Sequence, residues 1–197
     1  MPAGSEAAVD RLDPVRAWKR AQVLLHPAWR ELRFAGPVHH SHPYRPDDVF
    51  RCARGHRRVE PDCSCGFYAV PDAGELPPSI VVTALLEVEL EGRVVVHREC
   101  LRGERQRVRT VTFDGWCAFC VHEAQVLAGV RPAWRELPPP WLRAVPVCGG
   151  HRPQFGVQVT PVTASLLTGV TVRWDRSAES RAARSLRRLY DARGVLR

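Results

Sequence analysis

The chain has 197 residues, 45% of them hydrophobic, which is enough apolar side chain for one domain, or two small ones, to fold around a core. No run of eighteen apolar residues occurs, and residues 1–18 lack the basic start and apolar stretch of a secretory signal, so we expect no membrane association and a cytoplasmic location. The formal net charge of +8 favours an anionic partner such as nucleic acid, because a positive surface attracts phosphate and releases counterions.

Arginine supplies almost all of the positive charge. Of the 29 basic residues only Lys19 is a lysine, which is typical of a GC-rich genome. Such a codon bias explains arginine in place of lysine, but it does not explain why positive charge exceeds negative charge.

Residues 1–50 are predicted to form a segment of helix and loop. An amphipathic stretch occurs there, with apolar residues at Val15, Trp18, Ala21 and Leu25. We expect Pro27 to interrupt it, because proline breaks a helix. Three histidines follow in a turn-rich stretch: His39, His40 and His42. We interpret them as solvated loop residues, with metal binding or a low-pH role as the alternative.

Residues 80–97 are predicted to form two strands joined at Glu91–Gly92, because apolar residues alternate with polar ones before a glycine. A third strand is expected at residues 107–113. Together with the Cys/His stretch that precedes them, these strands define a predicted module over residues 51–114.

Residues 115–197 are predicted to form a second module. We expect a helix at 121–130, a short strand at 169–174, and a C-terminal helix with Ser177 as its N-cap and Gly194 at its end. Four arginines lie largely away from the apolar face of that last helix: Arg181, Arg184, Arg187 and Arg188.

The strongest chemical signal is a pair of short chelating motifs in this second module. Cys117 and Cys120 are separated by two residues, and so are Cys148 and His151, with twenty-seven residues between the pairs. Zinc ribbons and treble clefs close a tetrahedral site with two such pairs, since a two-residue gap lets both side chains reach one ion. We predict a structural zinc site.

A second set of candidate ligands lies in the first module: Cys52, His56, Cys63 and Cys65. Three thiols and an imidazole suit zinc better than the ions that prefer oxygen, so we predict a second zinc ion here. Two alternatives stay open. One is a buried cysteine pair beside an exposed histidine, and the other is an iron–sulfur cluster that uses one more thiol, such as Cys100.

Neither set points to catalysis. Each already supplies four protein ligands, which leaves no open position for the water that a catalytic zinc needs. Zinc nucleobase deaminases carry a proline before their Cys-x-x-Cys pair, whereas Gly115 and Trp116 precede Cys117. His122 and Glu123 form an adjacent pair without the rest of an H-E-x-x-H motif. We expect a protein that is not an enzyme.

One stretch carries a resemblance. The pattern C-x3-H-x6-C-x-C-G-F-Y-A that begins at Cys52, followed by "ALLEVELEGRVVVHREC", resembles a group of actinobacterial proteins of unknown function over residues 50–113. Those proteins usually have a tryptophan where this chain has Glu91. The resemblance implies a shared metal-stapled β module and implies no activity.

The sequence therefore predicts an α+β fold with small antiparallel sheets, two zinc-stapled modules and a C-terminal helix, in three segments: 1–50, 51–114 and 115–197. The predicted function is a non-enzymatic protein that holds two zinc ions and binds nucleic acid. The predicted contacts are Arg102, Arg105, Arg107, Arg181, Arg184, Arg187 and Arg188. The alternatives are a zinc-stabilised adaptor or assembly component that binds another protein and, third, an iron–sulfur or thiol redox sensor.

Overall fold

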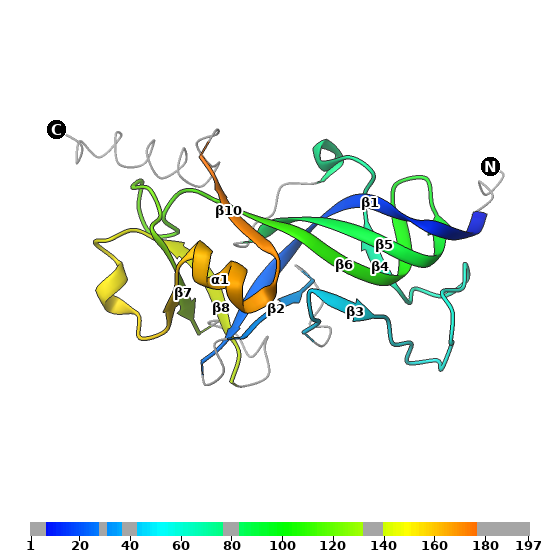
Figure 1. Ribbon diagram of the computed structural model, residues 1–197, viewed down its shortest axis with the longest axis horizontal. Helices are drawn as coiled ribbons and strands as arrows, with labels where there is room; N and C mark the ends of the chain where they lie inside the picture. The colour runs from blue at the N-terminus through cyan, green and yellow to red at the C-terminus, as the bar shows by residue number, and fades with distance from the viewer. Residues whose placement is uncertain (1–6, 28–30, 37–42, 77–82, 132–139, 177–197) are drawn as a thin grey trace.

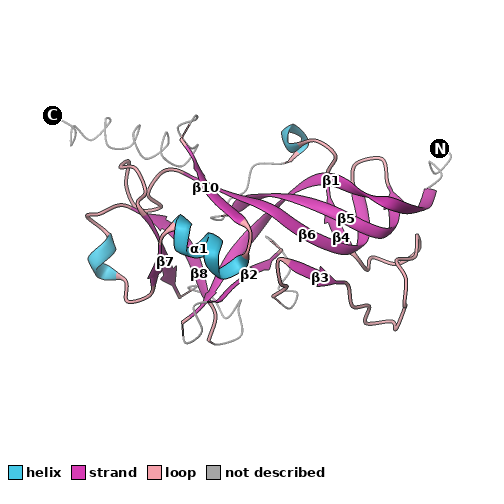
Figure 2. Cartoon of the chain, in the orientation of Figure 1, coloured by secondary structure: helices cyan, strands magenta, loops and turns pink. Residues whose placement is uncertain are grey.

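The computed structural model describes residues 7–27, 31–36, 43–76, 83–131 and 140–176, with the backbone alone for residues 7–12. Within these ranges the protein is mostly β-structure, with one short α-helix and two single-turn 3-10 helices (Figure 2). The predicted α+β fold is therefore wrong. The predicted C-terminal helix falls on residues 177–197, which lie outside the described residues.

The strands join into one curled sheet with the order β10-β6-β5-β1-β8-β7-β9, while β2 pairs with β1 and both β3 and β4 pair with β6 (Figure 1). All pairs are antiparallel except β10 with β6. The strands are β1 (Ala7–His26), β2 (Glu31–Ala35), β3 (Asp47–Val49), β4 (Phe67–Ala69), β5 (Ala84–Val96), β6 (Leu101–Asp114), β7 (Val126–Val130), β8 (Leu142–Val147), β9 (Gln158–Val159) and β10 (Thr171–Asp175). The helices are η1 (Ala73–Glu75), η2 (Arg152–Gln154) and α1 (Pro161–Thr168).

Strand β1 replaces the helix that was predicted in the N-terminal segment. Its first part pairs with β5 and its last part with β2 and β8, so it runs through both halves of the sheet. Pro14 lies in a bulge between Arg11 and Val15, where its missing N–H removes no ladder bond. The helix prediction failed because residues 21–26 are all buried, so the strand has no exposed face to give a regular alternation.

The predicted hairpin turn at Glu91–Gly92 is also wrong, because β5 continues through it. Gly92 has φ of 76° and lies where the register between β5 and β6 shifts, opposite Glu104. The connection between the two strands lies instead at residues 97–100. A glycine with positive φ occurs in β-bulges as well as in turns, so the sequence alone does not distinguish a bulge from a turn here. The strand predicted at 107–113 is confirmed within β6.

The predicted helix at residues 121–130 is wrong, since Val126–Val130 form β7 between β8 and β9. The strand predicted at 169–174 is confirmed as β10. Helix α1 was not predicted. Thr160 caps it by accepting a hydrogen bond from Thr163 N, and Gly169 ends it with φ of 67°.

The main core fills the concave side of the curled sheet. Its largest buried side chains come from distant strands and include Phe34, Leu86, Leu90, Phe113 and Leu127. The loop of residues 50–66 lies at one end of the molecule, and the Cys117–Cys120 and Cys148–His151 segments lie at the other (Figure 1). The sheet thus holds the two Cys/His sets far apart.

Candidate metal centres

The four predicted ligands of the second module converge on one point, which we call the second centre: Cys117, Cys120, Cys148 and His151. Their ligand atoms all lie within 4.8 Å of one another. Cys120 Sγ lies 3.5 Å from Cys148 Sγ, and His151 Nδ1 lies 3.4 Å from Cys148 Sγ. A tetrahedral zinc ion separates two sulfurs by about 3.8 Å and a sulfur from a nitrogen by about 3.6 Å, given its bond lengths. These residues fit such an ion.

Two backbone turns hold the second centre in place. Cys117 N donates to His122 O, and Ala118 N donates to Pro146 O, which ties the first turn to the end of β8. In the other turn, His151 N and Arg152 N both donate to Cys148 O. The centre therefore sits where β8 and the segment before β7 meet.

Apolar side chains surround the buried part of the second centre. Cys117 and Cys148 are buried in a cluster with Val126, Val145 and Val147. On the outer side, the ring of Phe119 is exposed and stacks on Phe155 at 5.5 Å between centroids. Burial of two of the four ligands suits a structural ion.

Crowding of the thiols perturbs their protonation. Burial opposes ionisation of Cys148, but hydrogen bonds from the side chain and backbone of His151 outweigh burial and lower its pKa to about 6. Burial and the neighbouring thiols of Cys148 and Cys117 raise the pKa of Cys120 to about 12. Cys120 therefore keeps its proton near neutral pH unless a cation joins the thiols.

The first centre consists of Cys52, His56, Cys63 and Cys65, and its ligand atoms also lie within 4.8 Å of one another. Cys52 Sγ lies 3.7 Å from Cys63 Sγ, and Cys65 Sγ lies 4.0 Å from His56 Nδ1. These separations again match a tetrahedral ion of zinc size. Cys63 is buried, while the other three ligands are partly exposed.

Hydrogen bonds between protein groups shape the loop of the first centre. Arg54 N donates to Cys52 Sγ at 3.3 Å, and Gly55 N donates to Cys52 O at 3.0 Å, which closes a tight turn. Gly55 adopts φ of 78° in that turn. Burial raises the pKa of Cys52, but backbone N–H groups of His56 and Arg54 outweigh burial and lower it. The turn thus favours a thiolate at Cys52.

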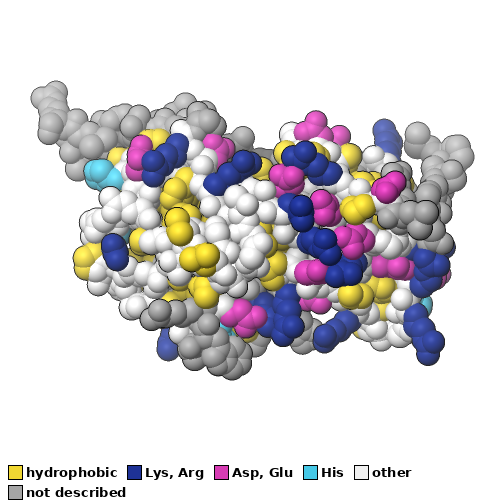
Figure 3. Space-filling view, viewed as in Figure 1, with side chains coloured by type: hydrophobic (Ala, Val, Ile, Leu, Met, Phe, Trp, Pro, Cys, Tyr) yellow, Lys and Arg dark blue, Asp and Glu magenta, His cyan; other side chains and the backbone are white. Residues whose placement is uncertain are grey.

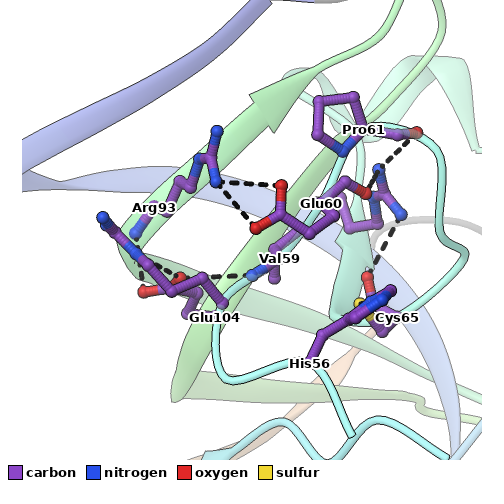
Figure 4. A network of polar contacts seen from close by, with 9 residues as sticks. His56, Val59, Glu60, Pro61, Cys65, Arg93 and Glu104 are labelled. Carbon is purple, nitrogen blue, oxygen red and sulfur yellow. Dashed lines mark hydrogen bonds and ion pairs between the residues drawn. The ribbon is translucent and has the colours of Figure 1, made fainter. Parts of the chain in front are cut away.

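Arg102, from β6, fixes the second part of this loop. Its guanidinium is fully buried and donates to three backbone carbonyls, those of Glu60, Pro61 and Cys65 (Figure 4). Gly66 follows with φ of 109°, and a Cβ there would lie 2.9 Å from Arg102 Cγ. Only glycine therefore lets the loop pass this close to β6.

Glu104 and Glu60 add a second set of contacts to the same loop. Glu104 accepts hydrogen bonds from Val59 N at 3.2 Å and from Arg93 N at 3.0 Å (Figure 4). Both carboxylate oxygens of Glu60 accept from Arg93 Nη1 at 3.1 Å. The bulge in β5 thus anchors the loop of residues 50–66, which we call the metal loop.

The arginines predicted to contact nucleic acid lie in a different setting from the one expected. Arg102 is buried as described. Arg105 forms two hydrogen bonds of 2.8 Å with the carboxylate of Asp47, and Arg107 lies 3.6 Å from the same carboxylate. Glu91 lies near both. The remaining four, Arg181, Arg184, Arg187 and Arg188, lie outside the described residues, as do His39, His40 and His42.

The iron–sulfur alternative weighed from the sequence finds no geometric support, and neither does a deaminase site, whose H-x-E motif the sequence analysis did not identify. Cys100 belongs to neither centre, so the fourth group beside Cys52, Cys63 and Cys65 is His56 rather than a fourth thiol. His97-Arg98-Glu99 has the H-x-E form seen in zinc deaminases, but it lies in the connection between β5 and β6, outside both groups.

Comparison of the chain with protein-family models, with curated proteins and with solved structures returned no match. Among the described residues, no helix is long and apolar enough to cross a membrane.

Proposed function

We propose that this protein is a non-enzymatic zinc protein that binds nucleic acid, with one zinc ion at each centre. The observation that carries the proposal is the donor set: each centre offers three sulfurs and one imidazole nitrogen at tetrahedral separations. Such donors suit zinc, whereas magnesium and calcium prefer oxygen ligands in larger coordination shells.

A structural role is proposed for both ions because four protein ligands complete a tetrahedron. A catalytic zinc keeps one position open for water and has a general base nearby. At the second centre, the ion would join two segments that are separated by twenty-seven residues, and at the first it would close one loop. In both places it would stabilise the fold rather than react.

Nucleic acid is proposed as the partner because the chain carries a formal net charge of +8, and all but one of its basic side chains (Lys and Arg) are arginine. Guanidinium groups bind phosphate through two parallel hydrogen bonds and keep their charge at every physiological pH. Contacts of this kind make binding sensitive to salt, because each one releases counterions from the nucleic acid.

Titration of fluorescent duplex DNA and duplex RNA with the zinc-loaded protein tests this part of the proposal. We expect dissociation constants in the micromolar range at about 50 mM salt, and a loss of about 40-fold at about 200 mM salt if three phosphates are contacted. Anisotropy reports both values. Absence of binding at low salt, or binding that salt does not weaken, would contradict nucleic-acid binding.

One observation favours the second candidate, an adaptor that binds another protein. Val162 and Leu166 lie four residues apart on α1 and are 71% and 81% exposed. Apolar side chains on one side of a surface helix are typical contacts for a protein partner. A protein that copurifies with the chain in fixed ratio, without the ultraviolet absorbance of nucleic acid, would favour this candidate.

A further inference from the structure

The loop of the first centre carries three arginines that are not paired with any carboxylate of the described residues: Arg51, Arg54 and Arg57. All three are exposed. Within the described part of the chain, no ion pair or side-chain hydrogen bond is recorded for any of them. We call these residues the arginine loop.

The arginines of the sheet differ from those of the arginine loop. On the sheet, positive and negative side chains alternate closely, as the mixed colours over β5 and β6 show (Figure 3). There Arg16 pairs with Glu87 and Arg109 pairs with Glu89. At the end of the molecule where Figure 1 places the metal loop, Lys and Arg side chains gather. Residues 51–62 carry four arginines against two carboxylates, those of Glu60 and Asp62.

The acidic residues of the metal loop do little to cancel this charge. Glu60 binds Arg93, and Glu104 from β6 binds Val59 N and Arg58. Asp62 is the exposed carboxylate that the loop retains. Three arginines without a carboxylate partner among the described residues, and Arg58, which pairs with Glu104, thus face solvent against one exposed acid.

The arginines are interleaved with metal ligands. Arg51 and Arg54 flank Cys52, and Arg57 follows His56 directly. Because the turn at Cys52 and Gly55 and the contacts of Arg102 fix the two ends of the loop, an ion bound by Cys52 and His56 would hold the backbone of all three arginines in one arrangement. An ordered set of guanidinium groups loses less entropy on binding phosphate than a mobile one.

We propose that the arginine loop is the nucleic-acid interface of this protein, and that metal in the first centre is required for its affinity. This inference rests on the proposed function and moves the interface from the sheet arginines Arg105 and Arg107 to the loop. The contacts are with the phosphate backbone, so binding depends weakly on base sequence.

The surroundings of the loop favour nucleic acid over an anionic membrane. Basic segments that bind membranes stably combine their charge with large apolar side chains that enter the lipid. Between residues 51 and 58 the exposed apolar side chain is Ala53, which is too small for that role. The larger exposed apolar side chains beside the loop, Val49 and Tyr68, belong to the short strands β3 and β4 rather than to the basic segment itself.

The test replaces the three loop arginines together: Arg51→Gln, Arg54→Gln and Arg57→Gln. A matched control removes the same charge from exposed arginines of the sheet: Arg16→Gln, Arg109→Gln and Arg173→Gln. We expect the loop variant to bind duplex DNA at least about tenfold more weakly, with a salt slope smaller by about 2 to 3. The control is expected to keep the slope of the unmodified protein within about one unit.

Two single variants extend the test. One removes a metal ligand, and the other removes a negative charge from the loop. Cys52→Ser removes a ligand of the first centre only, and we expect it to weaken binding as the triple loop variant does, with metal content confirming that the second centre stays loaded. Asp62→Asn removes the exposed acid of the loop, and we expect it to strengthen binding by about threefold to tenfold.

The outcomes separate the inference from the proposed function. If the unmodified protein binds no nucleic acid, or binds only vesicles of anionic lipid, both fail. If it binds and the loop variant binds equally well, or if loop and sheet variants weaken binding equally, the interface is not this loop and nucleic-acid binding stands. If Cys52→Ser binds normally while it lacks metal in the first centre, the requirement for metal is overturned.

Discussion

Lys19 is the only lysine of the chain, and the sheet partly buries it. Its Nζ donates to Gln106 Oε1 at 3.0 Å and lies over the rings of Tyr44 and Phe67 at 5.1 and 5.7 Å from their centroids. No carboxylate among the described residues pairs with it. Burial lowers the pKa of Lys19 to about 8, because the charged form has lost water without gaining a counterion.

This pKa makes the stability of the protein depend on pH. The unfolded chain holds the proton up to about 10.5 and the folded chain only up to about 8, so the unfolded state binds more protons between these values. The contribution of Lys19 to the free energy of unfolding therefore rises from pH 8 to 10.5. Below pH 8 the lysine is charged in both states, and the whole cost of burying the charge is present.

We expect Lys19→Met to be more stable than the unmodified protein at pH 7, by about 1 to 3 kcal/mol, and to lose that advantage as pH approaches 10. Urea unfolding of both proteins at four pH values between 7 and 10 gives the difference directly. A difference that does not change with pH would show that Lys19 has an ordinary pKa.

The metal ligands could be predicted from the sequence, and the residues that support them could not. Cys117 and Cys120 stand close in the chain, so their spacing alone indicated a chelating turn. Arg102 contacts carbonyls that are 37 to 42 residues away, and an arginine in a basic chain gives no sign of such a role. We therefore predicted it on the surface, where a charged residue ordinarily lies.

At the scale of the elements, buried stretches of strand without alternation account for the two helices predicted in place of strands. The core-facing residues of β5 alternate with polar ones, and that segment was predicted as strand. β1 and β7 lack the alternation over much of their length, and both were predicted as helix. A short apolar run has the same appearance in a buried strand and in a buried helix, so its pairing partners decide the outcome.

Gly92, in the bulge of β5, has little room for a side chain. Gly92 has φ of 76°, and a Cβ there would lie 2.6 Å from Glu104 Oε2 and 3.2 Å from Glu104 Cβ. We expect Gly92→Ala to lower the free energy of unfolding by about 1 to 2 kcal/mol, because the residue must adopt a left-handed backbone and displace the carboxylate that holds Val59.

Gly156→Ala is the matched control for the bulge. Gly156 has no positive φ, and nothing lies within 4 Å of the place its Cβ would take. We expect this variant to unfold within about 0.5 kcal/mol of the unmodified protein, as surface substitutions usually do. Equal stability of the two variants in denaturant titrations would show that the bulge does not need a glycine.

At the scale of the whole molecule, the sheet joins two metal centres that share no ligand. β1 pairs with β5 near the first centre's end and with β8 near the second, so a single strand connects both halves. The sequence indicated two metal sites but not this continuous sheet, because its pairs bring together residues up to about 120 positions apart, such as Leu24 and Arg143. Pairing over such distances leaves no local signal.

The centres differ in what holds them. Buried valines enclose the second, whereas polar contacts from Arg102, Glu104 and Arg93 hold the loop of the first. Zinc bound to sites of this kind contributes about 10 to 16 kcal/mol in model peptides, which is comparable to the stability of a domain. We therefore expect each centre to hold its own ion, independently of the other.

Native mass spectrometry of the protein purified without added metal tests this claim most directly. We expect the mass of the chain plus two zinc ions for the unmodified protein, and plus one zinc ion for Cys148→Ser and for Cys52→Ser. A chain without metal, a mass that corresponds to iron and sulfide, or two zinc ions retained in both serine variants would contradict it.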